Sequence, residues 1–543
     1  MALAEAPIRW TAAVGFALQA RVMLRAQRLA NHDHWQRETK RIQLGQLRKL
    51  LRAARQTEFG REHGFDRISR LQGDEMLAAY RAAVPIADWY AFQDRIARMR
   101  EGGEPDLLWP GLVGDFAQTS GTTAGDKFIP VSKPMFRSNY LTSLDIFAHL
   151  INRGFALPDV MGGRALFLGG STELETNEHG INTGDLSGLV TPLIRWPLTE
   201  VYTPGAEIAL ESHWPTKIEK MARLVIDQDV RFISGMPSWA CVLFERVLEL
   251  ARERGAPARV MRDVWPHLRV FVHGGVNYLP FLPKAGALWD GDATTDLPAR
   301  HELYPASEGF IAQQDGNWSE RGRNPPLRLC VDNFLFHEFV PLEEIGKDDA
   351  RAFAAWEVEP GVRYVVVPST CAGLWRYVLG DVVVFDTVPD GVHRGTGPAR
   401  VRIVGRHKHF INAFGENLIV EHIERAVADA SRAVGIEVGE FTAAPVYPAD
   451  GRRAGLELAI EVAGALDAET FSEAFDASLK EQNVDYTTKR SDGVGMGPPT
   501  ITRLDPGAFH RWLDAKGKLG GQHKCPRCAN HREIMDELVA SGA

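Results

Sequence analysis

The chain has 543 residues, of which 45% are hydrophobic and 24% are charged. This length exceeds that of one ordinary domain, so two or more domains are expected, with ample apolar material for a large core. The net charge of −8 (62 basic against 70 acidic residues) argues against non-specific binding of nucleic acid. Five thinly spread cysteines do not make a disulfide framework and favour a reducing cytoplasm.

The first hundred residues are predicted to be helical. Thr11–Leu24 is apolar but is interrupted by Gln19 and Arg21, and it is too short to span a bilayer. Because one basic residue precedes it and no clear cleavage site follows, a signal peptide is not expected. The pattern predicts an amphipathic helix packed on the body of the protein, with a membrane-surface role as the alternative.

Gln118–Lys127 (Q-T-S-G-T-T-A-G-D-K) gathers hydroxyls around glycine and ends on a lysine. Such residues suit a phosphate chain, because glycine lets the backbone approach it and lysine supplies a positive charge. The glycine spacing is not that of a P-loop, and Phe128–Ser132 has the pattern of a strand rather than a helix. We therefore predict a phosphate-binding hairpin loop between two strands, with an ordinary turn as the alternative.

The middle of the chain alternates predicted helices with short apolar strands that end in glycine. This pattern indicates a layered α/β domain, in which ligands bind beyond the carboxyl ends of the strands. The predicted helices are 134–151 and 236–252, and the strands are 164–169, 231–235 and 269–272. Short β-runs in 330–404 predict an antiparallel subdomain, and the residues from Gly405 predict a compact α+β tail domain.

Three further stretches carry groups suited to a nucleotide. Tyr304–Gly309 (Y-P-A-S-E-G) offers an aromatic ring, a hydroxyl and a carboxylate. An aromatic ring can stack on a purine, and a carboxylate can hold Mg²⁺. Trp375–Asp381 (W-R-Y-V-L-G-D) places a carboxylate after a glycine, where it can take both ribose hydroxyls, and Gly405–Lys408 (G-R-H-K) lies at the predicted domain boundary. Taken singly, each is as well explained by a surface or turn residue.

Taken together, these stretches resemble the adenylate-forming, firefly-luciferase-like superfamily, in their order and approximate spacing. Within it the chain resembles a bacterial member of the Gretchen Hagen (auxin-responsive) family of acyl-acid amido synthetases. The narrower resemblance rests on Phe336–Pro341 (F-H-E-F-V-P), Asn483–Arg490 (N-V-D-Y-T-T-K-R) and Gln522–Cys528 (Q-H-K-C-P-R-C). It implies an N-terminal domain, 1–404, that binds ATP and the acid, and a mobile C-terminal domain, 405–543, joined to it by a hinge.

The resemblance also implies a role for individual residues. The phosphates of ATP would be held by residues of the predicted loop, namely Thr119, Ser120, Gly121, Thr122, Thr123 and Lys127. Tyr304 would flank the adenine, with Ser307 beside the nucleotide, and Glu308 would ligate Mg²⁺. Asp381 would bind the ribose, and Arg406, in the motif that resembles the hinge, is also expected to bind the nucleotide.

The implied reaction is a ligation in two steps. A carboxylate attacks the α-phosphate of ATP to give an acyl-adenylate, and an amine, usually that of an amino acid, then displaces AMP. Lys524 is the expected catalytic lysine of the tail domain, with Lys516 and Lys518 as alternatives. The segments 234–239 and 273–278 are expected to line the acyl pocket, with Met236, Trp239 and Tyr278 as an apolar wall.

Arg376 or Arg490 is a candidate for binding the carboxylate of the amino acid. We expect a monomeric cytoplasmic enzyme whose partners are a small carboxylic acid and an amine. It would have no nucleic-acid partner and no stable membrane insertion.

Three other interpretations stay open at this point. His523, Cys525, Cys528 and His531 lie within nine residues and suggest a zinc module, although their spacing is not that of a standard finger. An acyl-CoA ligase would share the first half-reaction and differ only in the acceptor. A non-catalytic relative would bind nucleotide without turnover. The departures from the plant pattern at Pro305, Ala306, His523 and 410–421 concern the choice of substrate more than the chemistry.

Overall fold

The structure is a computed structural model that describes residues 10–119, 127–169, 174–184, 186–190, 196, 198–209, 211, 214–275, 278–320, 322–407, 410–411, 418–446, 455–483, 486–487, 490, 496–518, 524–529 and 531–541. The chain forms two compact units, and the boundary between them falls inside two strands, β15 and β16. The first unit holds nearly all of the chain up to Arg402, and the second holds most of the rest. The mixed α/β architecture predicted from the sequence is confirmed.

Helices begin the first unit, as predicted, and a buried stripe on each of them faces the core. In α2 the leucines Leu47, Leu50 and Leu51 are fully buried, because residues three and four apart share one face of a helix. The helices that precede the first strand are α1 (Ala12–Ala30), α2 (His32–Ala54), α3 (Glu58–Glu62), α4 (Phe65–Ile68), α5 (Gly73–Ala83), η1 (Trp89–Ala91) and α6 (Gln93–Arg100).

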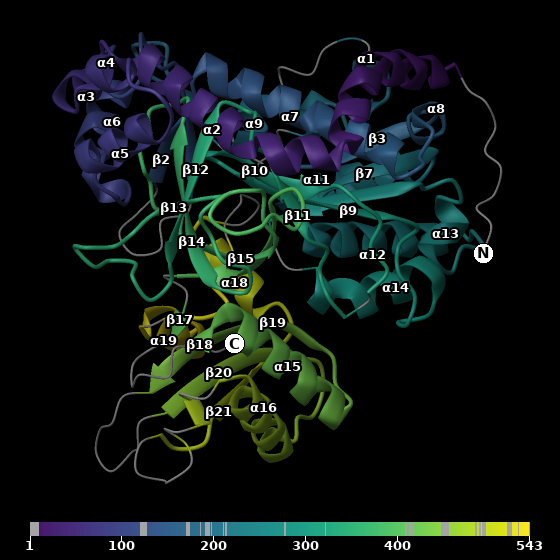
Figure 1. Ribbon diagram of the computed structural model, residues 1–543. Coiled ribbons are helices and arrows are strands. Elements are labelled where there is room, and N and C mark those ends of the chain that lie inside the picture. Colours follow the sequence, from purple (N-terminus) through teal and green to yellow (C-terminus); the bar gives the residue numbers. More distant parts are fainter. Residues whose placement is uncertain are drawn as a thin grey trace. The chain divides into compact units, whose positions relative to one another are not determined.

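A twelve-stranded sheet forms the centre of the described part of the first unit (Figure 1). In spatial order its strands are β13 (Phe353–Ala354), β12 (Leu335–Pro341), β14 (Arg363–Thr370), β15 (Asp381–Thr387), β16 (Arg400–Arg406), β11 (Leu327–Leu329), β10 (Gly309–Gln314), β9 (Arg300–Ala306), β8 (Val270–Gly274), β7 (Val230–Gly235), β3 (Arg164–Leu168) and β6 (Tyr202–Thr203).

The strands from β6 to β9 run parallel, whereas β9, β10, β11 and β16 pair antiparallel, as do β12 and β14. The predicted antiparallel part therefore extends the parallel sheet instead of forming a sheet of its own. Residues 331–334 form a turn, with Phe334 at φ +64°, so β12 begins only at Leu335.

Helices cover both faces of the parallel half of the sheet, with α7 on one side and α12 and α14 on the other (Figure 1). Alternate residues of β9 serve the two faces: the His301 ring lies 6.3 Å from that of His149 in α7, while Arg300 lies over the ring of Tyr278. These helices are α7 (Lys133–Asn152), α8 (Leu157–Val160), α9 (Leu186–Val190), η3 (Leu198–Glu200), α10 (Ala206–Ala209), α11 (Trp214–Val225), α12 (Pro237–Glu253), α13 (Met261–Val264), η4 (Leu279–Phe281) and α14 (Leu282–Asp290).

A smaller sheet carries the predicted phosphate loop. Its strands, in spatial order, are β2 (Lys127–Pro130), β1 (Asp115–Thr119), β5 (Asn182–Gly184) and β4 (Glu175–Thr176). After β2 the chain enters α7, where the Ser132 hydroxyl accepts a hydrogen bond from the backbone N–H of Met135 at 3.1 Å. This cap and the proline in the first turn explain why the helix starts there.

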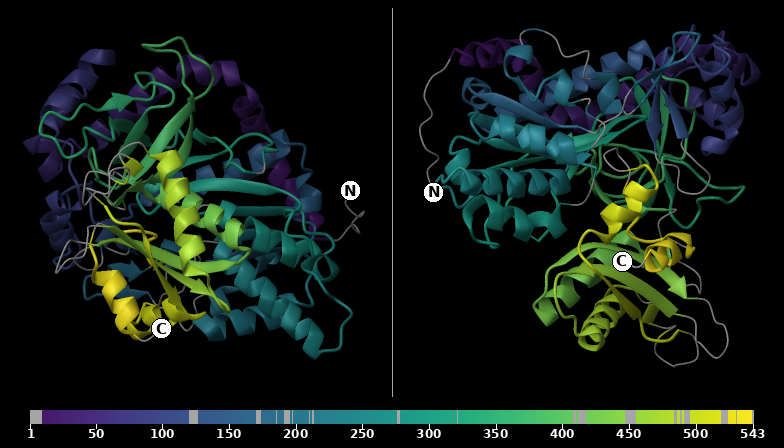
Figure 2. Two further views of the ribbon diagram at one scale, coloured as in Figure 1. Left: turned by 90° about the horizontal axis from the view of Figure 1, so that it is seen from below. Right: turned by 180° about the vertical axis from the view of Figure 1, so that it is seen from behind.

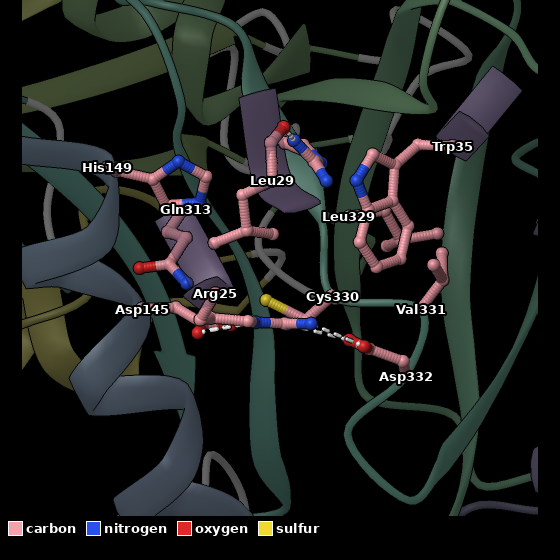
Figure 3. Close-up of a pocket in the computed structure, with 11 residues that line it drawn as sticks. Arg25, Leu29, Trp35, Asp145, His149, Gln313, Leu329, Cys330, Val331 and Asp332 are labelled. Atoms are coloured by element: carbon pink, nitrogen blue, oxygen red, sulfur yellow. Dashed lines mark hydrogen bonds and ion pairs between the residues drawn. The ribbon is translucent and has the colours of Figure 1, made fainter. Parts of the chain in front are cut away.

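Buried charges fasten α1 to the rest of the first unit. The Arg25 guanidinium donates to Asp145 of α7 at 2.6 and 2.8 Å and to Asp332, before β12, at 2.7 and 3.0 Å. Figure 3 shows Arg25 lying between the two carboxylates at a small cavity that Gln313 and Cys330 also line. Burial raises the pKa of Asp145, whereas the hydrogen bonds from Arg25 oppose that rise. These pairs hold one face of α1 against the core.

The second unit is built of helices packed on a sheet of its own (Figure 2). Alternate residues of the sheet β19-β20-β21 enter two cores: Ala443 and Leu458 pack with α15 and α16, and Ala444 and Ala459 with α18 and α19. Its elements are β17 (Phe410–Ile411), β18 (Leu418–Ile419), α15 (Val420–Val434), β19 (Val438–Val446), β20 (Gly455–Val462), α16 (Ala468–Gln482), β21 (Thr500–Leu504), α18 (Ala508–Ala515) and α19 (Glu533–Ala540).

Candidate active site

The two strands predicted to flank the phosphate loop are confirmed. β1 and β2 pair antiparallel from Phe116 opposite Pro130 to Thr119 opposite Lys127. Residues 120–126 connect the two strands, so Ser120, Gly121, Thr122 and Thr123 lie outside the described residues. Lys127 is therefore fixed at the base of this loop, on a strand whose partner ends at Thr119.

Glu308 occupies a tight turn between β9 and β10. Ala306 pairs with Gly309, so Ser307 and Glu308 are the two turn residues. Glu308 is 8% exposed, and Tyr304, which lies inside β9 rather than after it, is 3% exposed. Gly309 closes the turn at φ +143°, and a Cβ there would lie 2.7 Å from Cδ2 of Leu335. A glycine is thus needed for both the backbone angle and the space.

The Glu308 turn lies beside the start of the helix that follows the phosphate hairpin. A Cβ on Gly309 would lie 3.5 Å from Sδ of Met135, in the first turn of α7. The Ser132 hydroxyl, which caps that helix, also donates to the carbonyl of Cys371 at 2.5 Å. The two motifs, far apart in sequence, thus lie on adjoining elements of the first unit.

The segments predicted to line the acyl pocket lie at the same edge of the sheet as Glu308. β7, β8 and β9 are parallel neighbours, so their carboxyl ends, at Gly235, Gly274 and Ala306, share one edge. Met236 and Trp239 are half-buried at the start of α12, and Tyr278 is fully buried. The Tyr278 hydroxyl donates to Asp296 at 2.8 Å.

Two titratable groups in β8 and β9 are buried, which the sequence did not predict. His273 and Glu302 face each other across β8 and β9 in register and are 1% and 6% exposed. Burial lowers the pKa of His273 well below its ordinary value, and burial raises the pKa of Glu302 to about 8. Among the described residues, neither ring nitrogen of His273 nor Oε2 of Glu302 has a hydrogen-bond partner. Both side chains are therefore predominantly uncharged near neutral pH.

In the second unit, Asp381 and Arg406 come together. Nε of Arg406 lies 2.8 Å from Oδ1 of Asp381, and the backbone N–H of His407 donates to the carbonyl of Gly380 at 2.8 Å. Gly380 takes φ +98° directly before Asp381. Two motifs that the sequence assigned separately to the ribose and the hinge thus form one ion-paired cluster.

The tail lysines differ in their surroundings. Lys524 is exposed, three residues before a segment in which the carbonyl of Arg527 accepts from the backbone N–H of Ala443 in β19. Lys516 is paired with Glu537 at 2.6 Å and lies over the ring of Trp512. Both stay candidates for the catalytic lysine of the tail domain.

Neither arginine predicted for the amino-acid carboxylate is available to bind one. Arg376 is 5% exposed, and it donates to Glu338 at 2.9 Å and to the carbonyl of Val84 at 2.8 Å. Arg490 donates to both oxygens of Asp476, at 2.7 and 2.8 Å, and to the carbonyl of Met496. That prediction is wrong, because local structure already uses both guanidinium groups.

Glu338 is a further residue whose role the sequence did not reveal. It is fully buried, and besides Arg376 it accepts a hydrogen bond from Nε of Arg81 at 2.8 Å. Its position inside the F-H-E-F-V-P strand was the only signal in the sequence. The pair holds Arg376, which has φ +46°, at the start of the segment that leads to Asp381.

The described residues do not support the zinc interpretation. Cys525 packs in the core cluster around Phe509 and Met535, whereas Cys528 packs in the cluster around Ile423 and Phe475. The two thiols therefore belong to different cores on opposite faces of one sheet. His523 lies outside the described residues, and within them no group of three His, Cys, Asp or Glu side chains is arranged to hold a metal.

Three parts of the chain match the domains of one known protein family. Residues 28–204 match the GH3 family N-terminal domain, 328–393 the central domain and 421–533 the C-terminal domain. The chain is 24% identical to the indole-3-acetic acid-amido synthetase GH3.8 of Oryza sativa subsp. indica, over 89% of each chain. It is 22% identical to the jasmonoyl–L-amino acid synthetase JAR4 of Nicotiana attenuata, over 90% of this chain and 91% of that one.

Solved structures agree on the fold. The GH3.15 acyl acid amido synthetase superposes with a TM-score of 0.75 at 17% identity, covering 99% of this chain and 97% of the other. A 2-hydroxyisobutyryl-CoA ligase superposes with a TM-score of 0.55 at 15% identity, covering 92% and 91%. The fold is that of the adenylate-forming ligases. Within that class, the chain belongs to the GH3 (Gretchen Hagen) family, so the prediction of a ligase of this family is confirmed.

Proposed function

We propose that this enzyme activates a small carboxylic acid with ATP as an acyl-adenylate and transfers the acyl group to an amine, in the first instance that of an amino acid. The observation that carries the proposal is the arrangement in the first unit. Glu308 stands in a tight turn at the carboxyl edge of the parallel sheet, beside the helix that follows the phosphate hairpin. Membership of the GH3 family supports the same chemistry.

The residues predicted for ATP keep their roles in this proposal. The hydroxyls and backbone N–H groups of 119–123, together with Lys127, suit the phosphates, and Tyr304 would flank the adenine. Asp381, with Arg406 beside it, suits the ribose hydroxyls. A carboxylate is the kind of oxygen ligand that Mg²⁺ prefers, so Glu308 would hold Mg²⁺, which supplies positive charge at the phosphates.

The chain's task in the first step is to align two anions and neutralise their charge. A carboxylate oxygen attacks the α-phosphorus, the bond to the bridging oxygen breaks, and pyrophosphate leaves. Lys127 offsets charge on the phosphates, and Lys524 would bridge the acyl carboxylate and the α-phosphate. In the second step the amine attacks the acyl carbon, AMP leaves, and the nitrogen loses a proton.

The acid would enter at the ends of β7 and β8. Met236, Trp239 and Tyr278 would supply an apolar wall, which favours an acid with an aromatic or aliphatic body. An acyl-adenylate hydrolyses readily, so this wall would also keep water away. Movement of the tail domain about Arg406 and His407 would then admit the amine.

The test is acid-dependent exchange of pyrophosphate into ATP, across a panel of carboxylic acids and without amine. We expect exchange with at least one class of acid and a fall of roughly a hundredfold in Glu308→Gln, since a preorganised charged group is removed. The matched control is Glu320→Gln, an exposed carboxylate after β10. ATP binding without exchange for any acid would favour the non-catalytic relative.

An acyl-CoA ligase is the second candidate, favoured by the similarity of fold to the 2-hydroxyisobutyryl-CoA ligase. Its first half-reaction is the same, so exchange does not separate the two. Product analysis by mass spectrometry, with amino acids and CoA offered together, does. An amide product supports our proposal, and a thioester product overturns its second step.

We also place the enzyme in the cytoplasm, as a monomer. All five cysteines are buried, which suits a reducing compartment. Among the described residues, no helix is both long enough and apolar enough to cross a membrane.

A further inference from the structure

Helix α1 has a second apolar stripe that no described element covers. Phe16 is 63% exposed and Leu24 is 79% exposed, and alanines 13, 17 and 20, which are also exposed, lie on the same side of the helix. At 3.6 residues per turn the five positions fall within about 100° of the helix circumference, so they form one continuous stripe along the helix. We call these five residues the outer stripe. An ordinary surface helix carries charged and polar side chains there.

The opposite face of α1 is fixed, so the outer stripe cannot turn inward. Val14, Leu18 and Val22 are buried against the body of the first unit. Arg25 continues this face and is held by Asp145 and Asp332 in the paired arrangement of Figure 3. The direction of the outer stripe therefore follows from buried contacts on the other side of the same helix.

Positive charge lies along one edge of the outer stripe. Arg21 and Arg28, seven residues apart, are both exposed, and the Arg21 guanidinium lies 5.8 Å from the ring centre of Tyr140 in α7. Tyr140 and its neighbour Leu141 are 48% and 47% exposed. α1 contains no acidic residue, and the one acidic residue of α7, Asp145, is paired with Arg25. This surface is apolar and basic in a chain whose net charge is −8.

We propose that the outer stripe is a peripheral docking surface for an anionic lipid bilayer, with Phe16 and Leu24 entering the interface and Arg21 and Arg28 contacting lipid phosphates. Large apolar side chains flanked by arginine are what an interfacial helix requires. A second copy of the chain fits less well. A two-fold contact through the outer stripe would bring arginines against arginines with no carboxylate of α1 to pair them.

The test is co-sedimentation of the full chain with lipid vesicles. We expect binding to phosphatidylcholine vesicles that contain about 30% phosphatidylserine, and loss of that binding at about 0.5 M salt. The double variant Phe16→Ser/Leu24→Ser should bind roughly tenfold more weakly, because both inserted side chains are lost. The double variant Arg21→Gln/Arg28→Gln should lose the preference for phosphatidylserine.

The matched control is Val392→Ser/Val539→Ser, which removes two other exposed apolar side chains (71% and 45%) and should bind as the wild type does. All the variants change exposed residues outside the candidate active site, so pyrophosphate exchange should be unchanged in each. This readout separates the docking proposal from the proposed function.

Three results would overturn the proposal. The first is wild-type protein that does not bind the vesicles, or that binds pure phosphatidylcholine as well as the phosphatidylserine mixture, which would show that the outer stripe does not recognise an anionic bilayer. A concentration-dependent dimer that is lost in Phe16→Ser/Leu24→Ser, measured by analytical ultracentrifugation, assigns the outer stripe to a second copy. Binding by residues 10–543 but not by the full chain assigns it to the chain's own first nine residues.

Discussion

Glu338 shows how far a single buried charge depends on its partners. It has no solvent exposure, and Arg376 and Arg81 donate to its two oxygens at 2.9 and 2.8 Å. A buried ion pair is worth little net stability when intact, but its loss is costly when one partner goes and leaves the other charge unpaired. Arg376 also begins the segment that ends at Asp381, so the pair serves both stability and position.

Glu338→Gln should therefore lower the free energy of unfolding by about 3 kcal/mol, because Arg376 would remain buried without a counter-charge. Urea unfolding followed by tryptophan fluorescence measures this. Asp505→Asn is the control: Asp505 pairs with Arg503, both side chains are exposed (65% and 44%), and breaking such a surface pair should leave the unfolding midpoint unchanged. Equal midpoints for wild type and Glu338→Gln would contradict the role given to the pair.

Glu302 makes stability depend on pH with a definite sign. Burial raises its pKa to about 8, against the opposing charges of Arg300 and Arg402. In the unfolded chain the carboxyl titrates at about 4.3. As pH rises between these two values, the unfolded state loses the proton and the folded state keeps it, so stability falls until the folded pKa is passed.

Relative to Glu302→Gln, which does not titrate, the wild type should lose about 1.4 kcal/mol of stability per pH unit between pH 5 and pH 8. Urea midpoints of both proteins at each pH give the difference. Glu320→Gln, at an exposed position, should show no such trend. Parallel pH curves for wild type and Glu302→Gln would mean that Glu302 is ionised in the folded protein.

At the scale of elements, the β9–β10 hairpin fixes the position of Glu308. Its two-residue turn carries Ser307 and Glu308, and Gly309 holds the turn against Leu335 and Met135. The hairpin therefore ties the position of Glu308 to β12 and to the first turn of α7. A substitution that shifts the backbone at Gly309 should therefore lower the stability of the protein and weaken its binding of ATP.

Gly309→Ala should cost about 2 kcal/mol, because alanine resists φ +143° and its Cβ would meet Cδ2 of Leu335 at 2.7 Å. We also expect a higher KM for ATP in pyrophosphate exchange. Gly316→Ala is the matched control in the residues just after β10, where a Cβ meets nothing within 4 Å. A Gly309→Ala protein with normal stability and KM would show that the turn tolerates a side chain.

At the scale of the whole molecule, the chain passes between its two units inside β15 and β16. Gly405, at φ +152°, directly precedes Arg406 and His407, and a Cβ on it would make only ordinary contacts, 3.7 Å or more from Ile419 and Val420. Alanine at this position would meet no clash, but it would be strained, because residues with a side chain rarely adopt φ +152°. This makes Gly405 a probe of whether the units must move between the two half-reactions.

Gly405→Ala should leave pyrophosphate exchange within about twofold and slow amide formation several-fold, because only the second step needs the proposed movement. Both rates are measured on the same preparation. Gly346→Ala, at φ +84° and with nothing within 4 Å of a Cβ, introduces comparable backbone strain away from the boundary between the units and should change neither rate. Equal slowing of both reactions in Gly405→Ala would mean that the backbone here serves binding and not movement.

Sequence patterns were enough to predict several elements and the family. Apolar patterning predicted helices in the first hundred residues, glycine and hydroxyl clustering predicted the hairpin that carries the phosphate loop, and the order of motifs predicted an adenylate-forming ligase. These signals are local: each lies within about ten residues, where backbone period and turn chemistry decide the outcome.

Sequence patterns do not show which charged groups are already paired in the folded protein. Arg376 and Arg490 looked free in sequence, yet Glu338 and Asp476 occupy them. The tertiary structure also decided that Glu302 is kept from ionising and that one stripe of α1 stays exposed. The physical reason is that burial and pairing depend on residues far apart in the chain: Glu338 meets Arg81 across 257 positions.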